Sequence, residues 1–473
     1  MSLEDEVFDQ RLQRVREIEG LGFRAYGQRF EFTHTIPQIL ANWGALTAPE
    51  IEHHKPRATI TGRIQTLRRM GKAGFMHLAQ SGERLQVYVR KDAVPERDYK
   101  LYEILDIGDI VGVEGYLFRT RTGELSLHAE KLVFLSKILL SLPEKWHGLE
   151  DVEIRYRQRY LDLIANPESQ KNFRTRARVI ASLRRQLEER GFIEVETPMM
   201  QPLYGGAAAR PFVTHHNTLD MDLYLRIAPE LYLKRLIVGG MERVYEINRN
   251  FRNEGISTRH NPEFTMLEFY QAYTDYRGLM DLTEELLKQT AIDVTGSTVI
   301  SYQGNQIDLG SIRRMSMQEA VGDPNLKGHA LMAAFEANVE PTLIQPTIIY
   351  DYPVEVSPLS KNKLEDPAFV ERFEIYVGGL EMGNAYTELN DPKEQYRRFE
   401  MQLALAAAGD EEAHRMDEDY LRAMSYGMPP TGGEGIGIDR LAMLLTDSKS
   451  IRDVILFPLL RPEGDIGIAD KLK

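Results

Sequence analysis

The densest set of reactive side chains lies in two polar segments joined by a short loop, residues 243–254 and 264–270. Polar and apolar residues alternate in both, which predicts two β-strands whose successive side chains point to opposite faces. The polar side chains expected on one face of each strand are Glu246, Arg252, Glu254, Glu268 and Tyr270. Such a face is costly to bury unless a ligand pairs with it. The sequence therefore predicts a strand–loop–strand unit that binds a charged ligand, since an exposed hairpin would place Phe264 and Met266 in water.

The loop between these segments is basic, with Gly255 suited to a turn and Arg259, His260 and Asn261 after it. The run Phe-Arg-Asn-Glu, followed by Arg-His-Asn-Pro-Glu-Phe, resembles motif 2 of the class II aminoacyl-tRNA synthetases. Nearly the whole chain is similar to the bacterial lysyl-tRNA synthetases of subclass IIb. The resemblance implies that Arg259 and His260 hold the outer phosphates of ATP and that Asn261 lies on the adenine side. The full set of ATP-binding residues that it implies is Arg252, Glu254, Arg259, His260, Asn261, Phe264, Glu374, Glu381 and Arg440.

A second acidic cluster occupies residues 373–388, where two adjacent glycines suit a two-residue hairpin turn. Pairing across this turn puts Glu374 and Glu381 on one face. Carboxylates beside phosphates are the hard oxygen ligands that Mg²⁺ prefers, so this pair is the expected magnesium site. The remaining polar residues of the second strand fall on the opposite face if that strand is unbroken: Asn384, Tyr386 and Glu388. Because the resembled enzymes use both sets in one pocket, we predict a β-bulge near Gly383.

A glycine-rich motif occupies residues 432–445. Alternate glycines leave one strand face without side chains, which gives room for a flat base. Asp439 is expected to cap the following helix, and Arg440 to lie over the base opposite Phe264. The segment resembles motif 3 of the class II synthetases, and Glu434 is expected to face away from the site without altering its chemistry. A dinucleotide-binding fold is disfavoured, because its fingerprint should open a βαβ unit and no βα repeat follows.

The resemblance also implies an amino-acid site, with Gly206 contributing its backbone and Glu230 lying at the α-ammonium. A distal ammonium requires carboxylates and a hydrogen-bonding aromatic residue, which Glu268, Tyr270 and Glu388 provide. Aspartate would instead require Arg or Lys, so this contrast favours a basic substrate. The full set expected to bind lysine is Gly206, Glu230, Arg252, Glu268, Tyr270, Asn384, Tyr386 and Glu388.

No candidate nucleophile accompanies these groups, because the chain has no cysteine and neither a GxSxG motif nor a Walker loop. The hypothesised reaction is attack of the lysine carboxylate on the α-phosphate of ATP, followed by transfer of the lysyl group to the 3′ end of tRNA(Lys). The carboxylate needs no general base. Arg252, Glu254 and Arg440 are the expected catalytic residues, acting by positioning and charge neutralisation. Mg²⁺ is the expected cofactor, and no zinc is expected.

Residues 57–140 change to period-two runs that predict five strands, with a helix near residues 98–105 between the third and fourth. This order fits an OB-fold, whose exposed face binds single-stranded nucleic acid. Residues 55–150 contain 16 Lys and Arg against 12 Asp and Glu, a net charge of +4. Because the net charge of the whole chain is −13, the rest of the chain carries −17, and the basic residues are concentrated in this segment. The anticodon-binding residues that the resemblance implies are Arg68, Phe75, Gln86 and Glu124, although spacing alone leaves Phe75 equally suited to a core.

A long helix from Pro167 to a stop at Gly191, followed by a strand that ends at Pro198, resembles class II motif 1 and implies a homodimer. The basic run at residues 155–163 fits an acceptor-stem contact or a solvated helix face equally. We expect an α+β protein in which a five-stranded OB-fold barrel precedes a class II catalytic domain with an antiparallel sheet flanked by helices. The expected segments are a helical extension (1–54), the barrel (55–140), a linker (141–165) and the catalytic domain (166–473), with a small insertion outside its sheet (275–345).

Composition excludes several classes of protein. The 473 residues are 42% hydrophobic and 27% charged, as in ordinary globular proteins, and no apolar run approaches the roughly 20 residues that span a bilayer. The acidic N-terminus lacks a signal core, and the absence of cysteine excludes disulfides and thiolate metal sites. A cytoplasmic location without membrane association is expected.

Three alternatives stay open from the sequence. An aspartyl- or asparaginyl-tRNA synthetase of the same subclass is disfavoured by the acidic pocket. A paralogue that transfers lysine to a protein is disfavoured because such paralogues lack the anticodon module. A non-catalytic tRNA-binding relative is disfavoured by the intact set of charged residues around Arg252 and Arg440.

Overall fold

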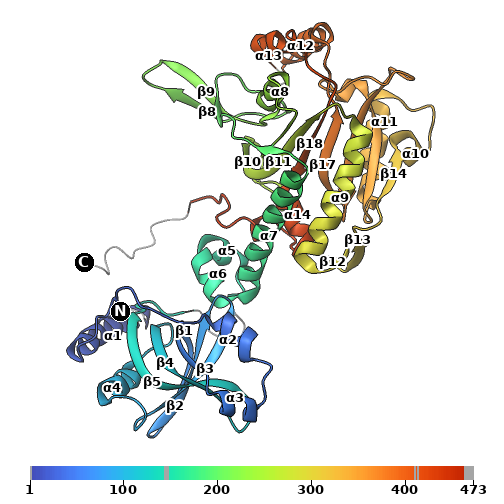
Figure 1. The fold of residues 1–473 in the computed structure, drawn as a ribbon. Helices are drawn as coiled ribbons and strands as arrows, with labels where there is room; N and C mark the ends of the chain where they lie inside the picture. The colour runs from blue at the N-terminus through green and yellow to red at the C-terminus, as the bar shows by residue number, and fades with distance from the viewer. Residues whose placement is uncertain (1–2, 143–148, 410–411, 413–414, 463–473) are drawn as a thin grey trace. The chain divides into compact units, whose positions relative to one another are not determined.

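The computed structural model describes residues 3–142, 149–409, 412 and 415–462 (Figure 1). The chain divides into two compact units, Met1–Lys171 and Asn172–Lys473, and the dividing point falls inside helix α7 (Pro167–Glu189). The predicted linker segment 143–148 lies outside the described residues. No helix in the described part of the chain is long and apolar enough to cross a membrane.

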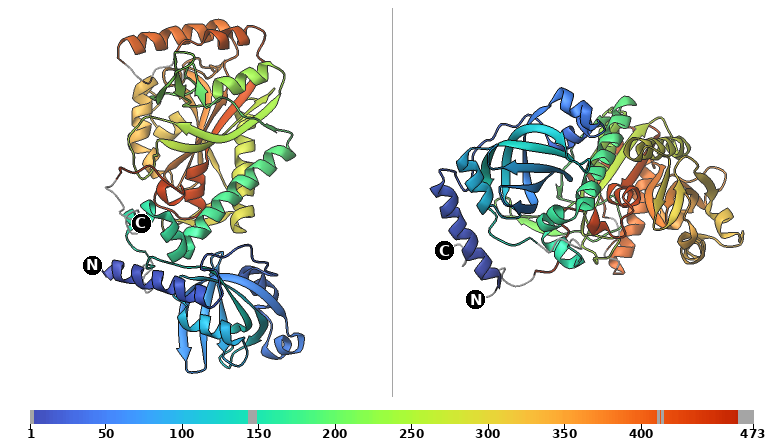
Figure 2. Two further views of the ribbon diagram at one scale, coloured as in Figure 1. Left: turned by 90° about the vertical axis from the view of Figure 1, so that its left-hand side faces the viewer. Right: turned by 90° about the horizontal axis from the view of Figure 1, so that it is seen from below.

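The first unit is built on a closed five-stranded barrel with the strand order β1-β2-β3-β5-β4, which confirms the predicted OB-fold (Figure 2). Its strands are β1 (Arg57–Met70), β2 (Ala73–Gln80), β3 (Glu83–Arg90), β4 (Ile110–Arg119) and β5 (Leu125–Ser136). Its helices are α1 (Leu3–Gly20), α2 (Ile36–Trp43), α3 (Ala48–His54), α4 (Glu96–Ile104), α5 (Val152–Arg157) and α6 (Arg159–Ala165). Helix α4 lies between the third and fourth strands, as predicted. Capping boxes at Thr35 and Thr47 start α2 and α3.

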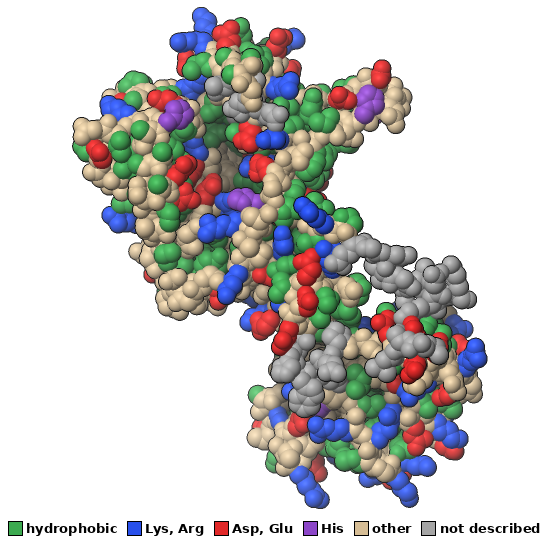
Figure 3. Space-filling view, turned by 180° about the vertical axis from the view of Figure 1, so that it is seen from behind, with side chains coloured by type: hydrophobic (Ala, Val, Ile, Leu, Met, Phe, Trp, Pro, Cys, Tyr) green, Lys and Arg blue, Asp and Glu red, His purple; other side chains and the backbone are tan. Residues whose placement is uncertain are grey.

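Alternation along the barrel strands separates an apolar interior from a polar exterior. Met76 and Leu78 are fully buried in the barrel core, whereas Phe75 is only half-buried and lies outside that core. Basic side chains are numerous on the barrel face shown in Figure 3. Phe75 is therefore available for stacking on the outer face of the barrel.

The predicted linker is partly helical, because its second half forms α5 and α6. Its basic residues are neutralised locally: Arg155 and Arg159 both donate to the buried carboxylate of Asp162, at 2.8 and 2.6 Å. This local pairing favours an internal structural role over a free basic face for these two residues.

The second unit is organised around an eight-stranded sheet in the order β14-β15-β16-β17-β18-β11-β10-β6. Only the pairs β14–β15 and β10–β6 at its two edges are parallel. The strands of this sheet are β6 (Ile193–Glu194), β10 (Arg243–Phe251), β11 (Glu263–Ala272), β14 (Arg313–Ser316), β15 (Thr347–Pro353), β16 (Phe369–Val377), β17 (Leu380–Thr387) and β18 (Thr431–Gly437). Smaller sheets are formed by β7 (Met200–Gln201), β8 (Val213–His216) and β9 (Met221–Leu225), and by β12 (Val299–Tyr302) and β13 (Asn305–Asp308). The antiparallel sheet expected from the sequence is thus confirmed for the six central strands.

Helices cover both faces of this sheet. Helices α7, α9 (Tyr276–Thr295) and α14 (Ile438–Leu445) bury the main core on one face. Helix α8 (Glu230–Val238) packs over the other face at β10 and β11 and is followed by α12 (Pro392–Ala407) and α13 (Glu418–Met424). The remaining helices are α10 (Met317–Val321) and α11 (Gly328–Asn338), with 3₁₀ turns at Glu340–Thr342, Val354–Val356 and Ile451–Asp453.

The expectation that residues 275–345 form an insertion outside the catalytic sheet is wrong. Asp275 caps α9, and Leu279 and Leu286 of that helix are buried in the main core of the sheet. Strand β14 is the edge strand of the same sheet. The amphipathic pattern of the segment could not distinguish packing against this sheet from packing against a separate core, because periodicity gives a buried face but not its partner.

Candidate active site

Four neighbouring strands bring the predicted motifs to one face of the sheet. The register pairs Glu246 with Glu268 across β10 and β11, and Glu268 with Gly435 across β11 and β18. Gly435 in turn pairs with Asn384 on β17. Directly paired residues point to the same side, so all four strands contribute to one surface. The alternation predicted a strand as far as residue 254. Strand β10 instead ends at Phe251, so Arg252 and Glu254 lie in the loop that follows it.

The predicted β-bulge is confirmed in β17. Tyr376 pairs with Glu381 and Ile375 with Gly383, so Met382 is an extra residue without a partner. The bulge turns the later residues of β17 by one position, and Asn384 consequently pairs with Glu374 on the site face. Both polar sets of the hairpin therefore face the same pocket side.

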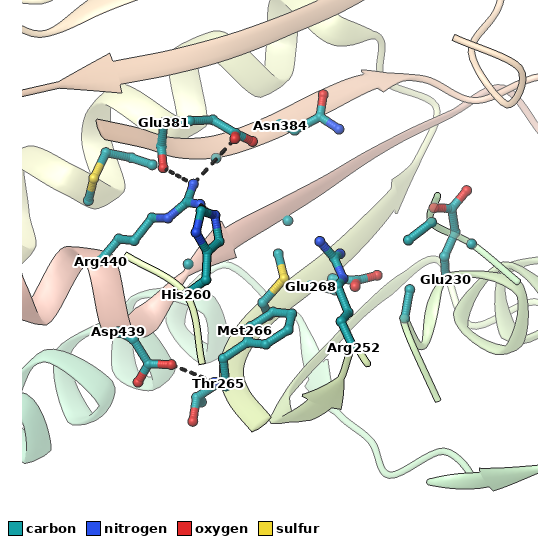
Figure 4. A pocket seen from close by; sticks show the side chains of 18 of the residues that line it. Glu230, Arg252, His260, Thr265, Met266, Glu268, Glu381, Asn384, Asp439 and Arg440 are labelled. Carbon is teal, nitrogen blue, oxygen red and sulfur yellow. Dashed lines mark hydrogen bonds and ion pairs between the residues drawn. The ribbon is translucent and has the colours of Figure 1, made fainter. Parts of the chain in front are cut away.

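This surface lines a pocket of about 300 Å³. In Figure 4, Arg440 and Glu381 lie at one end of the pocket and Glu230 at the other. Arg252 and Glu268 lie between the two ends. Figure 3 shows acidic, basic and histidine side chains gathered around a hollow on the second unit. A ligand that fills this pocket meets cations at one end and carboxylates at the other.

Arg440 is the central cation of the first end. Its Nη1 donates to the carbonyl oxygen of Glu381 at 2.6 Å and to Glu381 Oε2 at 3.2 Å, while its Nη2 lies 3.5 Å from His260 Nε2. Burial and the Arg440 charge lower the pKa of His260, so this imidazole is neutral at pH 7 and able to accept or donate one hydrogen bond. The end therefore carries fixed positive charge from arginine and none from histidine.

Arg252 faces the pocket without an ion-pair partner among the described residues. Its guanidinium carbon lies 5.1 Å from the centre of the Phe264 ring, and its buried Nε has no hydrogen-bond partner in that part of the chain. Burial lowers the pKa of Arg252, although the charges of Glu254 and other carboxylates oppose this. A partly buried guanidinium without an ion-pair partner is costly unless an anion binds it. Arg252 is accordingly the strongest candidate for contact with a phosphate or carboxylate.

The predicted capping role of Asp439 is wrong, because helix α14 begins after Gly437 without a side-chain cap. Asp439 instead accepts the backbone N–H of Thr265 at 2.7 Å and a hydrogen bond from Arg176 of α7. It therefore ties β11, α7 and α14 together and fixes the helix that carries Arg440. Spacing alone could not separate these roles, because a first-turn aspartate suits either.

Glu374 and Glu381 are the pair expected to hold magnesium. Glu381 lines the pocket, whereas Glu374 is buried behind it and accepts hydrogen bonds from Tyr352 at 2.9 Å and from Arg372 at 2.5 Å. Burial and the neighbouring charge of Glu374 raise the pKa of Glu381. Two carboxylates that repel each other fit a divalent cation, which would relieve that repulsion. No cluster of three or more acidic, histidine or cysteine residues suited to a metal occurs in the described part of the chain.

The opposite end of the pocket is acidic. Tyr386 donates to Glu230 Oε1 at 2.8 Å, and Tyr270 donates to Glu268 Oε2 at 3.3 Å. Burial raises the pKa of Glu268 to about 8. Gly206 approaches Glu230 closely at a positive φ of 87°, and a Cβ there would lie 2.8 Å from the Glu230 Cβ. Tyr386 was expected only to line the alkyl chain of a lysine substrate. Its hydroxyl in addition donates a hydrogen bond to Glu230.

Glu388 lies just behind the wall at this end and is fully buried. Its Oε1 has no hydrogen-bond partner among the described residues. A Cβ added at Gly433 would lie only 2.2 Å from this oxygen, so Glu388 occupies the space that a side chain at Gly433 would need. Its Oε2 is ion-paired with Lys234, a buried cation that also pairs with Glu230. Sequence reasoning missed Lys234 and Gly433. The i,i+4 spacing of Glu230 and Lys234 on one helix was the available signal for the first.

Most predicted site residues meet in the one pocket. Those that line it are Gly206, Glu230, Arg252, Glu254, Arg259, His260, Asn261, Phe264, Glu268, Tyr270, Glu381, Asn384, Tyr386 and Arg440. Glu374 and Glu388 stand behind its wall. Arg372 was missed: it is bonded to Asn384 Oδ1 at 2.9 Å and to Glu374, and so connects the two polar sets.

The outer face of the barrel carries a separate polar network. Gln86 donates to Glu124 Oε2 at 2.8 Å and accepts from Ser126 at 2.8 Å, while His77 Nε2 lies 3.0 Å from Glu124 Oε1. The ring of Phe75 lies 4.8 Å from that of Tyr88 on the same face. The structure thus brings three of the four predicted anticodon residues to one face, and Arg68 is exposed on β1 beside Phe75 in the register. An aromatic platform with an amide at its edge is suited to stacked, hydrogen-bonded bases.

Comparison with known families agrees with both units. Residues 151–461 match the family described as tRNA synthetases class II (D, K and N), and residues 58–135 match the OB-fold nucleic acid binding domain. The chain belongs to this class II tRNA synthetase family.

Similar proteins narrow the comparison further. The chain is 53% identical to the Lysine--tRNA ligase of Pelotomaculum thermopropionicum, a similarity that covers 97% of this chain and 95% of that protein. It is 50% identical to the Lysine--tRNA ligase of Bacillus subtilis, over 97% and 98% of the two chains, and 50% identical to that of Staphylococcus aureus. Within the class II family, the chain groups with the lysine--tRNA ligases.

Proposed function

We propose that the chain activates L-lysine with ATP to give lysyl-adenylate and pyrophosphate, and transfers the lysyl group to the 3′ end of tRNA(Lys). The observation that carries this proposal is the acidic end of the pocket, where Glu388 Oε1 is buried without a hydrogen-bond partner among the described residues. A substrate ammonium would supply that partner. The nearby cation, Lys234, is already paired with two carboxylates, so a substrate with an acidic side chain is not favoured.

In this proposal lysine lies across the middle of the pocket. Glu230 and the backbone at Gly206 hold its α-ammonium, and Arg252 holds its carboxylate beside the α-phosphate of ATP. Glu268, Tyr270 and Glu388 hold the side-chain ammonium, with Asn384 and Tyr386 beside the alkyl chain. Arg252 neutralises charge that develops on the α-phosphate, which is where a preorganised cation lowers the barrier most.

ATP lies at the other end. Arg259 and His260 hold the outer phosphates, Glu254 and Asn261 lie on the adenine side, and the base lies between Phe264 and Arg440. Magnesium, held by Glu374 and Glu381 together with phosphate oxygens, supplies charge neutralisation when bound. The buried Asn261 Oδ1, which has no hydrogen-bond partner in the described part of the chain, supports a polar ligand on the adenine side.

The two chemical steps need no protein nucleophile. A lysine carboxylate oxygen forms a bond to the α-phosphorus, and the bond to the β-phosphate oxygen breaks to release pyrophosphate. The terminal tRNA hydroxyl then attacks the lysyl carbonyl and AMP leaves with both bonding electrons. The chain contributes alignment and charge, worth several orders of magnitude in such reactions.

On the barrel, we propose that Phe75, Gln86, Glu124 and Arg68 contact the anticodon. A homodimer through α7 and β6, and a cytoplasmic location where tRNA, ATP and lysine are available, belong to the same proposal. Exposed apolar residues such as Ile193 on β6 support an interface there.

ATP–pyrophosphate exchange without tRNA, measured with each of the twenty amino acids in turn, tests the proposed reaction. Exchange with lysine alone is the expected result. Exchange with aspartate or asparagine would overturn the roles of Glu268 and Glu388, and silence with every amino acid in a protein that still binds tRNA would overturn the activity itself.

A further inference from the structure

Lys234 is a fully buried cation that the proposed mechanism does not use. It lies on α8 one turn after Glu230, and its Nζ is 2.5 Å from Glu230 Oε1. The same ammonium is ion-paired with Glu388 Oε2, and it lies 5.4 Å from the centre of the Tyr386 ring. Burial disfavours the charged amine, but the two carboxylates outweigh burial and raise the pKa of Lys234 above its ordinary value. Lys234 is therefore charged at neutral pH.

The pairing divides the two oxygens of Glu388 between different tasks. One oxygen is held by Lys234, and the other has no hydrogen-bond partner among the described residues. Burial raises the pKa of Glu388, and Lys234 is the principal charge that opposes protonation of this carboxyl group. Lys234 therefore favours the ionised form of Glu388, which is the form that attracts a cation.

Two carboxyl groups share a single resident cation at this end. Lys234 is ion-paired with one oxygen of Glu230 and with one oxygen of Glu388. Tyr386 and Lys234 converge on the same oxygen of Glu230, which fixes its position on both sides. The arrangement is a preformed receptor with one free carboxylate oxygen.

We propose that Lys234 is a resident positioning residue of the amino-acid pocket. It holds Glu230 and Glu388 by one oxygen each and leaves the second Glu388 oxygen as the seat for the side-chain ammonium of the substrate. This inference rests on the proposed activation of lysine and assigns a role to a residue outside the set expected to contact the substrate. A single free oxygen suits a primary ammonium, whereas a guanidinium would need both oxygens for its two parallel hydrogen bonds.

The first test is Lys234→Met, which keeps an unbranched side chain only one atom shorter and removes the charge. Lysine-dependent ATP–pyrophosphate exchange should show a rise of about 100-fold in KM for lysine, because one member of a buried charge pair is lost. The KM for ATP should change by less than about threefold, since the phosphate end is untouched. A general loss of structure would move both constants, so this difference separates positioning from stability.

Arg235→Met is the matched control on the same helix. Arg235 pairs with Asp417 at 2.7 Å and with Asp419 at 3.0 Å, away from the pocket. Its loss also removes a cation from α8, yet the KM for lysine should stay within about twofold of the wild-type value. A large rise in this control would overturn the claim that the pocket depends on Lys234 in particular.

Chemical rescue provides a second, independent readout. In Lys234→Ala the missing ammonium leaves a cavity beside Glu388, and propylammonium added to the assay should restore lysine activation at least about tenfold. Propanol, which has a similar size and no charge, should not. Unchanged KM for lysine in a folded Lys234→Met variant, or equal rescue by the alcohol, would overturn the proposal. Failure of the wild-type chain to activate lysine would instead overturn the proposed function.

Discussion

The carboxyl group of Glu434 points from β18 toward α9, and we expect it to make the stability of the catalytic unit depend on pH. It is almost completely buried, and Thr283 of α9 donates to its Oε2 at 2.6 Å. Its Oε1 has no hydrogen-bond partner in the described part of the chain. Burial raises the pKa of this carboxyl group from 4.5 to about 8, although Thr283 opposes the shift. At neutral pH it is therefore mainly a protonated acid inside the core.

The size of the effect follows from the pKa difference between the folded and unfolded chain. Between about pH 4.5 and pH 8 the folded state keeps a proton that the unfolded state loses, so stability falls as the pH rises. At about 1.4 kcal/mol per unit, this removes about 3 kcal/mol at pH 7 and about 5 kcal/mol above pH 8. Below pH 4.5 both states are protonated and nothing is lost.

Glu434→Gln removes the titration while keeping the size of the side chain. The free energy of unfolding should rise by about 3 kcal/mol at pH 7 relative to wild type, and by more at pH 9, with little change at pH 4.5. Urea unfolding should be followed by circular dichroism. Glu365→Gln, at an exposed position, is the control and should show no pH-dependent gain. Parallel pH curves for wild type and Glu434→Gln would refute the reasoning.

Four further outcomes are expected. Arg252→Ala should reduce adenylate formation at least about 1000-fold, measured by pyrophosphate exchange, while tRNA binding in a filter assay is retained; exchange close to wild type would contradict its role. Gly433→Ala should raise the KM for lysine at least about tenfold, because the new Cβ would lie 2.2 Å from Glu388 Oε1; an unchanged KM would show that this oxygen is not needed. Lysine binding should release up to about one proton at pH 7, because an ammonium beside Glu268 lowers a pKa that burial holds near 8. The affinity for lysine should therefore rise with pH up to about 8. Calorimetry in buffers of different ionisation enthalpy would reveal the released proton, and Glu268→Gln should abolish its release. Gln86→Leu should raise the KM for tRNA at least about tenfold and leave exchange without tRNA unchanged, a separation that would fail if the barrel had no part in tRNA binding.

Much of the site was predictable because it depends on alternation. Successive side chains of a strand point to opposite faces, so residues two positions apart share a face. The common face of Glu268 and Tyr270 could therefore be predicted from the sequence. The bulge near Gly383 was predicted from the resemblance, because the resembled enzymes use both polar sets of β17 in one pocket. The shared face of Glu268 and Tyr270, in contrast, depends only on local order in the sequence.

The features that the sequence did not yield depend on which elements pack together. Lys234 meets Glu388 only because α8 lies beside the residue that follows β17, and Glu434 meets Thr283 only because α9 packs against β18. Asp439 binds Arg176 for the same reason. A side chain's partner across such a contact is set by tertiary packing, which residue spacing along one chain segment does not specify.

The single extra residue at Met382 makes the two halves of the site separately adjustable. Before it, Glu381 contacts Arg440 at one end of the pocket, and after it Tyr386 donates to Glu230 at the other end. Changes in β17 that are meant to alter substrate choice can therefore be confined to its residues after the bulge. Deletion of this one residue would turn the later residues of β17 toward the face covered by α7, α9 and α14. Length in β17 is consequently more constrained than composition, and libraries for altered amino-acid use should vary side chains there and never insert or delete.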